Sequence, residues 1–175
     1  IQIYLDKVKE HDLANQASQT LEEKAWIKNV IHIAGGKNTD EQSGFRETLN
    51  SLGTDITNSD FGANVYYFQK ESTDVIGEST SKQIERLLKE GSSIINYLGH
   101  SSTSTFEFTI NEPVEWNNKG RYPVFSAMGC SAGQIHGTIF GLSDRYVQIQ
   151  DEGAIAFISG SGSQFPNALV AWARP

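Results

Sequence analysis

Five short apolar runs, separated by longer amphipathic stretches, constrain the fold of this chain more than any other feature of its sequence. Each run is rich in β-branched or aromatic residues and is apolar at consecutive positions, which is typical of a strand buried on both faces. Such strands belong mainly to parallel sheets whose two faces are covered by helices. The predicted strands span residues 29–35, 64–69, 93–99, 122–129 and 153–159.

Helical patterns lie between the predicted strands. Thr39 with Gln42, and Thr80 with Gln83, have the spacing of a capping box, and apolar residues follow each pair at helical intervals. A further helix is expected between residues 143 and 153. Because strands that alternate with helices form parallel sheets with crossover helices, the sequence predicts an α/β fold, a three-layer α/β/α sandwich around a mainly parallel sheet.

The length of 175 residues and a hydrophobic fraction of 38% suit one ordinary domain, which we expect to span residues 1–175, with residues 1–25 as a flanking helix. The chain has 14 basic and 21 acidic residues and no basic cluster, which argues against nucleic acid or an anionic membrane as partner. No apolar stretch approaches the ~18 residues that a membrane span requires. Because the chain begins at Ile1 and not at Met, we expect it to be part of a longer protein.

Two of the predicted strands end on residues that suit covalent catalysis. The run "INYLGH" ends at His100, and "VFSAMGC" ends at Cys130, the only cysteine of the chain. In α/β proteins, ligands bind at the carboxyl ends of the strands. If the two strands are neighbours, their spacing of ~4.8 Å brings the imidazole and the thiol close together. The sequence therefore predicts a histidine and cysteine pair at one edge of the sheet.

Such a pair has a direct chemical use. A thiol with its ordinary pKa of ~8.5 is only slightly ionised at neutral pH, and a neighbouring imidazole can take its proton and later deliver it to a leaving group. Gly99 and Gly129 precede the two residues and permit sharp turns and close approach. The backbone N–H groups of residues 131–133 are then available to a developing oxyanion. Acyl transfer through a thioester is the chemistry that this arrangement indicates.

Each of these residues also has an interpretation without a catalytic role. A single cysteine is most often a small buried hydrophobic residue, and a histidine at a strand end is usually a hydrogen-bonded surface residue. Glu41 either caps the helix after the first strand or orients His100, and the first interpretation is preferred. His136, in a glycine-rich loop, either lines the cleft or is solvated. No metal ligands are expected, although an oxygen-only calcium site leaves no trace in a sequence.

Taken together, the two strand-end motifs resemble those of the gingipain-type cysteine peptidases, family C25, of the caspase-like clan. In that clan one apolar strand ends on the catalytic histidine and the next ends on the catalytic cysteine. The resemblance runs from Trp26 to Phe165 and includes "INYLGH", "VFSAMGCSAG", "LSDRYV" and "GAIAFISGSGS". The segments "IHIAGGKNTDEQSGF" and "GHSSTSTFEF" are most similar to the sortase-like C25 proteins of the type IX secretion system.

For individual residues, the resemblance implies a caspase-like fold in which His100 is general base and acid and Cys130 is the nucleophile. The backbone N–H groups of Ser101 and Cys130 would hold the oxyanion, and Ser101 stands where the family commonly has glycine. The loop from residue 160 to Phe165 would border the substrate pocket, with Phe165 as a wall; His136 is a second candidate for its lining.

For the whole protein, the resemblance implies a cysteine peptidase or transpeptidase that acts on C-terminal signals of secreted proteins. Its partners would be a protein or peptide substrate and other secretion-system components. Its location would be extracellular or on the cell surface, in association with the outer membrane. No cofactor is expected, and a structural calcium ion is compatible with the sequence.

Two other interpretations stay open. The stretch "GCSAGQ" suggests a nucleophile-elbow cysteine amidase, but the glycine spacing around the cysteine differs, and the histidine of such enzymes follows the cysteine in the chain. Alternatively, the chain is a catalytically inactive scaffold or binding domain of a secretion system. Labelling with a thiol-directed peptide probe distinguishes these interpretations, because only an assembled site reacts faster than a simple exposed thiol.

Overall fold

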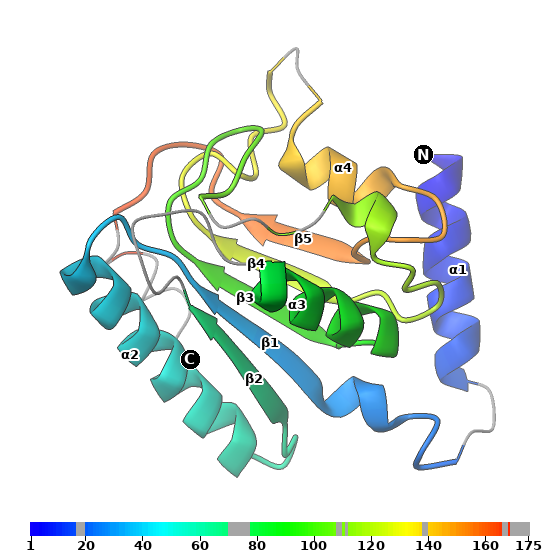
Figure 1. The fold of residues 1–175 in the computed structure, drawn as a ribbon. Helices are drawn as coiled ribbons and strands as arrows, with labels where there is room; N and C mark the ends of the chain where they lie inside the picture. The colour runs from blue at the N-terminus through cyan, green and yellow to red at the C-terminus, as the bar shows by residue number, and fades with distance from the viewer. Residues whose placement is uncertain are drawn as a thin grey trace.

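The computed structural model describes residues 1–16, 20–69, 78–107, 112–137 and 140–165, together with Ile110 and Ala168. Its centre is a sheet of five parallel strands in the order β2-β1-β3-β4-β5 (Figure 1). The strands are β1 (Asn29–Ala34), β2 (Asn64–Gln69), β3 (Ile94–Leu98), β4 (Val124–Met128) and β5 (Ala156–Ser159). The helices are α1 (Gln2–Gln16), α2 (Thr39–Asn58), α3 (Glu78–Glu90) and α4 (Leu142–Gln148), with 3₁₀ turns at Ala25–Lys28 and Pro113–Glu115. The predicted α/β class with a parallel sheet is confirmed.

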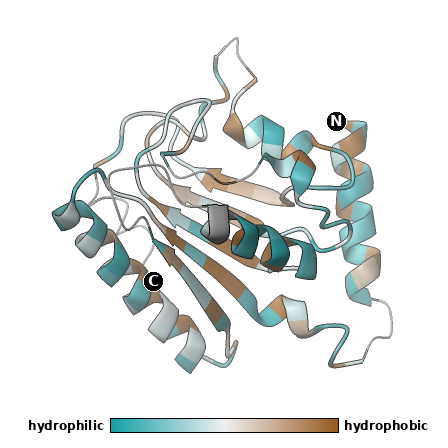
Figure 2. Cartoon of the chain, viewed as in Figure 1, coloured by the Kyte–Doolittle hydropathy of each residue, from teal (hydrophilic) through white to brown (hydrophobic). Residues whose placement is uncertain are grey.

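Helices cover both faces of this sheet, because successive strand side chains point to opposite sides. One face packs against α3 and α4 in a large cluster of apolar residues that includes Tyr97 and Phe125. The opposite face packs against Leu49 of α2 through Leu98 and Met128. Figure 2 shows apolar residues concentrated in the strands and hydrophilic residues on the helices around them. The inner strands β1, β3 and β4 are apolar on both faces for this reason.

The helix starts differ from those predicted. Helix α2 begins at Thr39, but its N-cap is Asn38, whose side chain accepts a hydrogen bond from the N–H of Glu41 at 3.0 Å. Helix α3 begins at Glu78, two residues before Thr80, so Thr80 lies inside the helix. Asparagine caps a helix at least as well as threonine, which explains why the α2 boundary shifts by one residue.

Three strands also differ from their predictions, either in burial or in the residue at which they begin. Strand β2 lies at one edge of the sheet, and its Tyr66 and Tyr67 are exposed, so it is not buried on both faces as predicted. Strand β4 begins at Val124 and not at Tyr122, because Pro123 has no N–H to donate to a strand neighbour. Strand β5 begins at Ala156, since Gly153 adopts a positive φ of 80° and is part of the preceding turn.

Helix α1 occupies residues 2–16 of the segment 1–25 in which a flanking helix was expected, and polar contacts attach it to the rest of the fold. Lys7 is 3% exposed, and its Nζ donates to the carbonyl oxygens of Val147 (3.0 Å) and Glu152 (2.6 Å). Tyr122 donates a hydrogen bond to Glu10 at 2.7 Å. Burial lowers the pKa of Lys7 to about 8. This lysine anchors α1 to the turn between α4 and β5, which a hydrophobicity pattern does not indicate.

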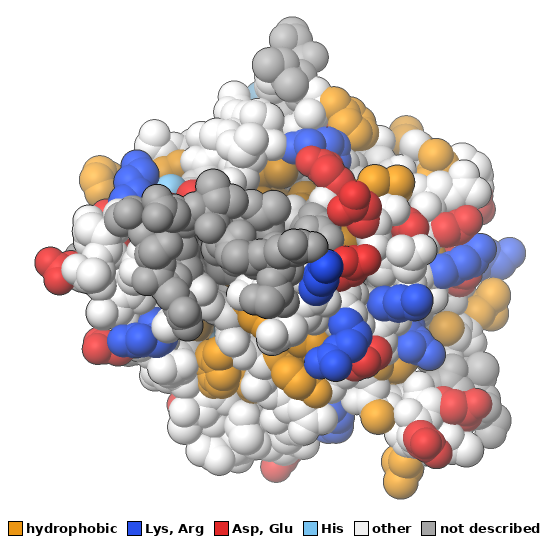
Figure 3. Space-filling model, in the orientation of Figure 1, with side chains coloured by type: hydrophobic (Ala, Val, Ile, Leu, Met, Phe, Trp, Pro, Cys, Tyr) orange, Lys and Arg blue, Asp and Glu red, His pale blue; other side chains and the backbone are white. Residues whose placement is uncertain are grey.

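On the face shown in Figure 3, basic side chains lie among acidic ones. Across the residues that the structure describes, no helix has both the length and the apolar character to cross a membrane.

Candidate active site

His100 and Cys130 lie at corresponding positions beyond the carboxyl ends of two neighbouring strands. Strands β3 and β4 pair in parallel with Leu98 opposite Met128, and each candidate residue follows its strand by two positions. The N–H of Gly99 donates to Met128 O at 3.2 Å, and Ser101 Oγ donates to Cys130 O at 2.8 Å. The sheet thus brings together two segments that are 30 residues apart in the sequence, at the edge where the loops gather in Figure 1.

Gly129 is required for this close approach. A Cβ atom at Gly129 would lie 2.8 Å from Gly99 O and 2.3 Å from Ser101 Oγ, both shorter than a real Cβ contact. Any side chain at this position therefore pushes the histidine and cysteine segments apart. The glycine before the cysteine is explained by packing between the two loops.

The imidazole of His100 is oriented by the first turns of α2. Its Nε2 lies 2.9 Å from Oε2 of Glu41, and its ring meets the ring of Phe45 edge-on with centroids 6.3 Å apart. Residues 41 and 45 are one helical turn apart, so they present their side chains on the same face. The side chains of His100 and Glu41 are 34% and 35% exposed, so both remain accessible to solvent.

Glu41 makes contacts that fit both of its alternative interpretations, near the helix start and at His100. Its Oε2 accepts the N–H of Lys37 at 2.8 Å, close to the helix start, and also contacts His100. The Lys37 N–H bond, followed by the contact with His100, holds the pKa of Glu41 below its ordinary value. Glu41 is therefore an ionised acceptor, so Nε2 of His100 carries the proton that it donates to Glu41.

Backbone groups of residues 160–164 surround Cys130. Gln164 donates its N–H to Cys130 Sγ at 3.4 Å, and Sγ lies 3.7 Å from Gln164 O. The N–H groups of Ser131 and Gly133 donate to the carbonyl oxygens of Gly162 (2.9 Å) and Gly160 (3.1 Å). The expectation that the N–H groups of residues 131–133 serve an oxyanion is therefore wrong for Ser131 and Gly133, because both are already paired.

Ser101, the other proposed oxyanion donor, lies in a short antiparallel turn with a bridge to Phe106. The hydrogen bonds of this turn run from Ser102 N to Thr105 O (2.8 Å) and from Glu107 N to His100 O (3.1 Å). In such a bridge the paired residues themselves direct their N–H groups away from the partner strand. The N–H of Ser101 consequently points away from Phe106 and out of the turn.

The remaining candidates lie on the loops around this edge. His136 is exposed in the loop between β4 and α4. Phe165 is 80% exposed and directly follows Gln164, the residue that contacts the thiol. Of the aromatic residues between β3 and β4, Phe106 and Trp116 pack into the core, so they do not wall an open pocket. Phe108 lies outside the described residues.

Within the described part of the chain, the thiol and the imidazole hydrogen-bond to Gln164 and to Glu41, and not to each other. Catalytic hydrogen bonds of free enzymes are often loose and tighten only when substrate binds. Gln164 was missed by the sequence analysis, because its contacts use backbone atoms that any residue provides. In the described ranges, no group of three or more His, Cys, Asp or Glu residues could hold a metal ion.

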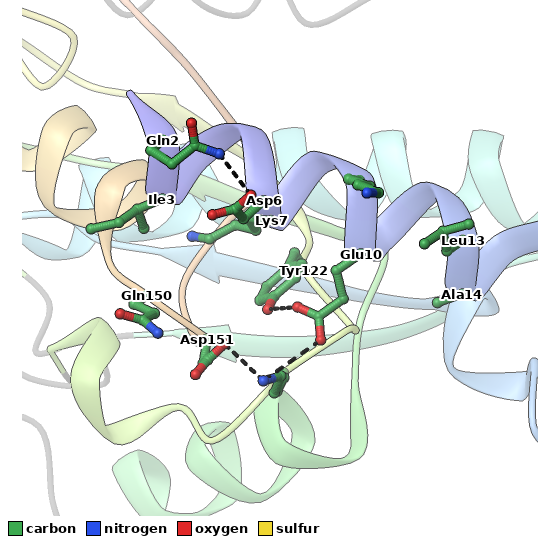
Figure 4. A pocket seen from close by; sticks show the side chains of 12 residues that line it. Gln2, Ile3, Asp6, Lys7, Glu10, Leu13, Ala14, Tyr122, Gln150 and Asp151 are labelled. Carbon is green, nitrogen blue, oxygen red and sulfur yellow. Dashed lines mark hydrogen bonds and ion pairs between the residues drawn. The ribbon is translucent and has the colours of Figure 1, made fainter.

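A hollow of about 680 Å³ lies elsewhere, along the flank of α1 (Figure 4). Its lining includes Ile3, Glu10, Tyr122 and Asp151, and Lys119 bridges Glu10 (3.8 Å) and Asp151 (2.9 Å) across it. None of the candidate catalytic residues lines this hollow. Three of its charged side chains, Lys119, Glu10 and Asp151, are therefore paired with one another.

The fold is similar to that of several solved protease structures. A structure described only as a protease superposes with a TM-score of 0.75 and 17% sequence identity, over 97% of this chain and 36% of the other. The Arg-specific cysteine proteinase gingipain R (RgpB) gives 0.71 and 17%, over 94% of this chain and 38% of the other. The complex of the Porphyromonas gingivalis RgpB pro- and mature domains gives 0.71 and 16%, over 95% and 40%.

The family assignment follows from the sequence as a whole. The pattern of peptidase family C25 matches residues 1–174, and the chain belongs to this family. No curated protein matches the sequence at a significant level. The chain spans between 36% and 40% of the length of the solved structures that it resembles.

Proposed function

We propose that this chain carries the catalytic residues of a cysteine peptidase, with Cys130 as nucleophile and His100 as general base and acid. One observation carries the proposal: the two residues occupy corresponding positions beyond adjacent parallel strands. Membership of peptidase family C25 and the gingipain-like fold support the same activity. Intact nucleophile and base argue against an inactive scaffold, and the histidine-before-cysteine order argues against a nucleophile-elbow amidase.

The proposed reaction begins with proton transfer from the thiol to Nδ1 of His100, while Nε2–H donates to Glu41. Sγ of Cys130 then attacks the carbonyl carbon of the substrate, and the electron pair of the C=O bond moves to oxygen. The N–H groups of Ser101 and Cys130 stabilise this oxyanion. When the tetrahedral intermediate collapses, the C–N bond breaks, and imidazolium transfers its proton to the leaving amine. The product is a thioester on Cys130.

Deacylation uses the same residues in reverse order. His100 removes a proton from the incoming nucleophile, which attacks the thioester carbonyl, and the thiolate leaves and is reprotonated. Water as nucleophile gives proteolysis, whereas an amine gives a transfer product. During either step the backbone of residues 160–165 borders the thiol, so Phe165 forms one wall of the substrate pocket and His136 faces the same opening in this proposal.

The finer proposal concerns substrate and location. Similarity of the segments 31–45 and 99–108 to sortase-like C25 proteins supports transfer or cleavage at C-terminal signals of secreted proteins, with other secretion-system components as partners. The corresponding location is extracellular or at the cell surface, in association with the outer membrane. Single-turnover reactions of the full-length protein with and without a small amine decide between the two outcomes. Hydrolysed peptide alone at saturating amine would eliminate transfer and leave an endopeptidase.

The peptidase proposal itself is tested with a panel of peptidyl acyloxymethyl ketones that differ in the residue next to the reactive group. We expect an assembled site to react with at least one panel member much faster than the reactivity of its thiol toward iodoacetamide would predict. Cys130→Ala should eliminate this labelling. Labelling no faster than that of a simple exposed thiol would instead identify an inactive scaffold.

A further inference from the structure

We infer that Glu107 is a positioning residue of the proposed catalytic site, acting through the backbone on both sides of His100. The inference rests on the proposed function and extends it to a residue outside the catalytic pair. Glu107 Oε1 accepts the N–H of His100 at 2.9 Å and the N–H of Gly36 at 2.6 Å. A carboxylate oxygen thus joins the chain segments that follow β3 and β1, at the edge of the sheet where the site lies.

The neighbouring glycines show that the carboxylate fits a prepared space. A Cβ atom at Gly35 would lie 2.1 Å from Glu107 Oε1, and one at Gly99 would lie 2.8 Å from it. Neither position tolerates a side chain while Glu107 occupies this place. Phe106, the preceding residue, packs against Tyr97 with ring centroids 4.7 Å apart, so the backbone that carries Glu107 is fixed by the core.

Glu107 and Glu41 both link His100 to the segment formed by Gly36 and Lys37. Gly36 and Lys37 donate their consecutive N–H groups to Glu107 and to Glu41, respectively. Glu107 then binds the backbone N–H of His100, and Glu41 binds its side-chain Nε2. The two carboxylates therefore fix the peptide and the imidazole of His100 against the same two-residue segment, which determines where the base points.

The same contacts orient the proposed oxyanion donor. The peptide group between His100 and Ser101 has its carbonyl oxygen held by the N–H of Glu107 (3.1 Å) and by the hydroxyl of Tyr97 (2.5 Å). Burial, and next the charge of Glu107, raise the pKa of Tyr97 well above its ordinary value, so the hydroxyl keeps its proton. Because a trans peptide directs N–H opposite to C=O, anchoring this carbonyl fixes the direction of the Ser101 N–H.

The test measures how fast the acyloxymethyl ketone that reacts fastest with the wild type inactivates three proteins: Glu107→Ala, Glu107→Gln and the wild type. Glu107→Ala leaves the N–H groups of His100 and Gly36 without their acceptor. We expect the maximal inactivation rate constant to fall about 10²-fold, the scale of a base displaced by about 1 Å, with little change in the probe's half-saturation concentration. Glu107→Gln keeps an acceptor oxygen but loses the charge, so we expect partial rescue to within about tenfold of the wild type.

Controls separate positioning from general stability. Glu115→Ala removes an exposed glutamate outside the site and is expected to leave rate and melting temperature unchanged. Amide hydrogen exchange of His100 and Gly36 should accelerate in Glu107→Ala and stay near wild type in Glu107→Gln. If Glu107→Ala does not fold, the test rests on the inactivation rate constant and the amide hydrogen exchange of Glu107→Gln. A rate constant that falls several-fold at an unchanged half-saturation concentration supports the positioning role, and a wild-type rate constant overturns it.

Different results would contradict the proposed catalytic function and the positioning role of Glu107. If His100→Ala is inactivated as fast as the wild type, the proposed catalytic function fails, whatever Glu107 does. If His100→Ala is impaired while Glu107→Ala reacts at the wild-type rate, the function stands and the positioning role of Glu107 is wrong. A rate loss in both Glu107 variants that is matched by an equal loss of folded protein would assign Glu107 a purely structural role.

Discussion

The two halves of the candidate site are held in place by different means. His100 is fixed by side chains from distant segments: Glu41 on its imidazole, and Glu107 and Tyr97 on its backbone. Cys130 is fixed mainly by backbone groups, since Gln164 contacts its thiol through N–H and C=O. The position of His100 is therefore sensitive to substitution of the side chains around it. The position of Cys130 is sensitive to changes in the path of the neighbouring backbone.

The largest effects are expected from the two catalytic residues themselves. Cys130→Ala and His100→Ala should each lower the rate of peptide cleavage by about 10³-fold or more, because nucleophile and base act as one unit. Steady-state kinetics on a fluorogenic peptide measures the loss. His136→Ala, which changes an exposed histidine of the same loop region, should retain most of the activity. Comparable losses in all three variants would undo the assignment.

A backbone change on the cysteine side should have the next largest effect. Gly129→Ala introduces a Cβ atom 2.8 Å from Gly99 O, so the two loops must separate. We expect a loss of about 10²-fold in activity, because displacements of about 1 Å have this cost, together with about 1–3 kcal/mol in the free energy of unfolding. Gly44→Ala is the matched control, since no atom lies within 4 Å of its new methyl group, and it should stabilise α2 by about 0.5–1 kcal/mol. Full activity of Gly129→Ala would show that the close approach is not needed.

On the histidine side, Glu41→Gln should reduce the turnover number roughly tenfold, because a neutral amide orients the imidazole less strongly than a carboxylate. The Lys37 N–H bond, and next the contact with His100, lower the pKa of Glu41 in the folded chain, so the ionised carboxylate stabilises the fold above the unfolded pKa of ~4.3, and this stabilisation is lost as the pH falls through the lower native value. The difference in unfolding free energy between wild type and Glu41→Gln should therefore shrink below about pH 4. Glu47→Gln, an exposed change on the same helix, should show neither effect.

The sequence predicted the sheet and the two strand ends well, because both depend on local patterns. The apolar runs ending at His100 and Cys130 become β3 and β4, which pair as neighbours. Contacts between distant segments were harder to predict: the contact of Glu41 with His100, 59 residues away, was only the less preferred of two interpretations, and Glu107 has no distinctive motif around it. The Lys7 anchor was also missed, since a buried lysine breaks the hydrophobic pattern on which the prediction rests.

The smallest effect is expected from Phe165, at the end of the loop that contacts the thiol. Its side chain is 80% exposed, so Phe165→Ala removes little packing from the folded chain, and the melting temperature should not change. If the residue walls the substrate pocket, the half-saturation concentration for peptide should rise about threefold, consistent with the loss of about 25 Å² of apolar contact or more. An unchanged half-saturation concentration for every peptide tested would remove Phe165 from the pocket.

The central claim is that Cys130 forms a thioester with the substrate only when His100 assists it. The most direct measurement is intact-mass analysis of the full-length protein, quenched with acid during turnover of a peptide ester, followed by peptide mapping. The account predicts a mass increase equal to the acyl group, located on Cys130, released by hydroxylamine and absent or greatly slowed in His100→Ala. Acylation of a different residue, or equal acylation of Cys130 in wild type and His100→Ala, would contradict it.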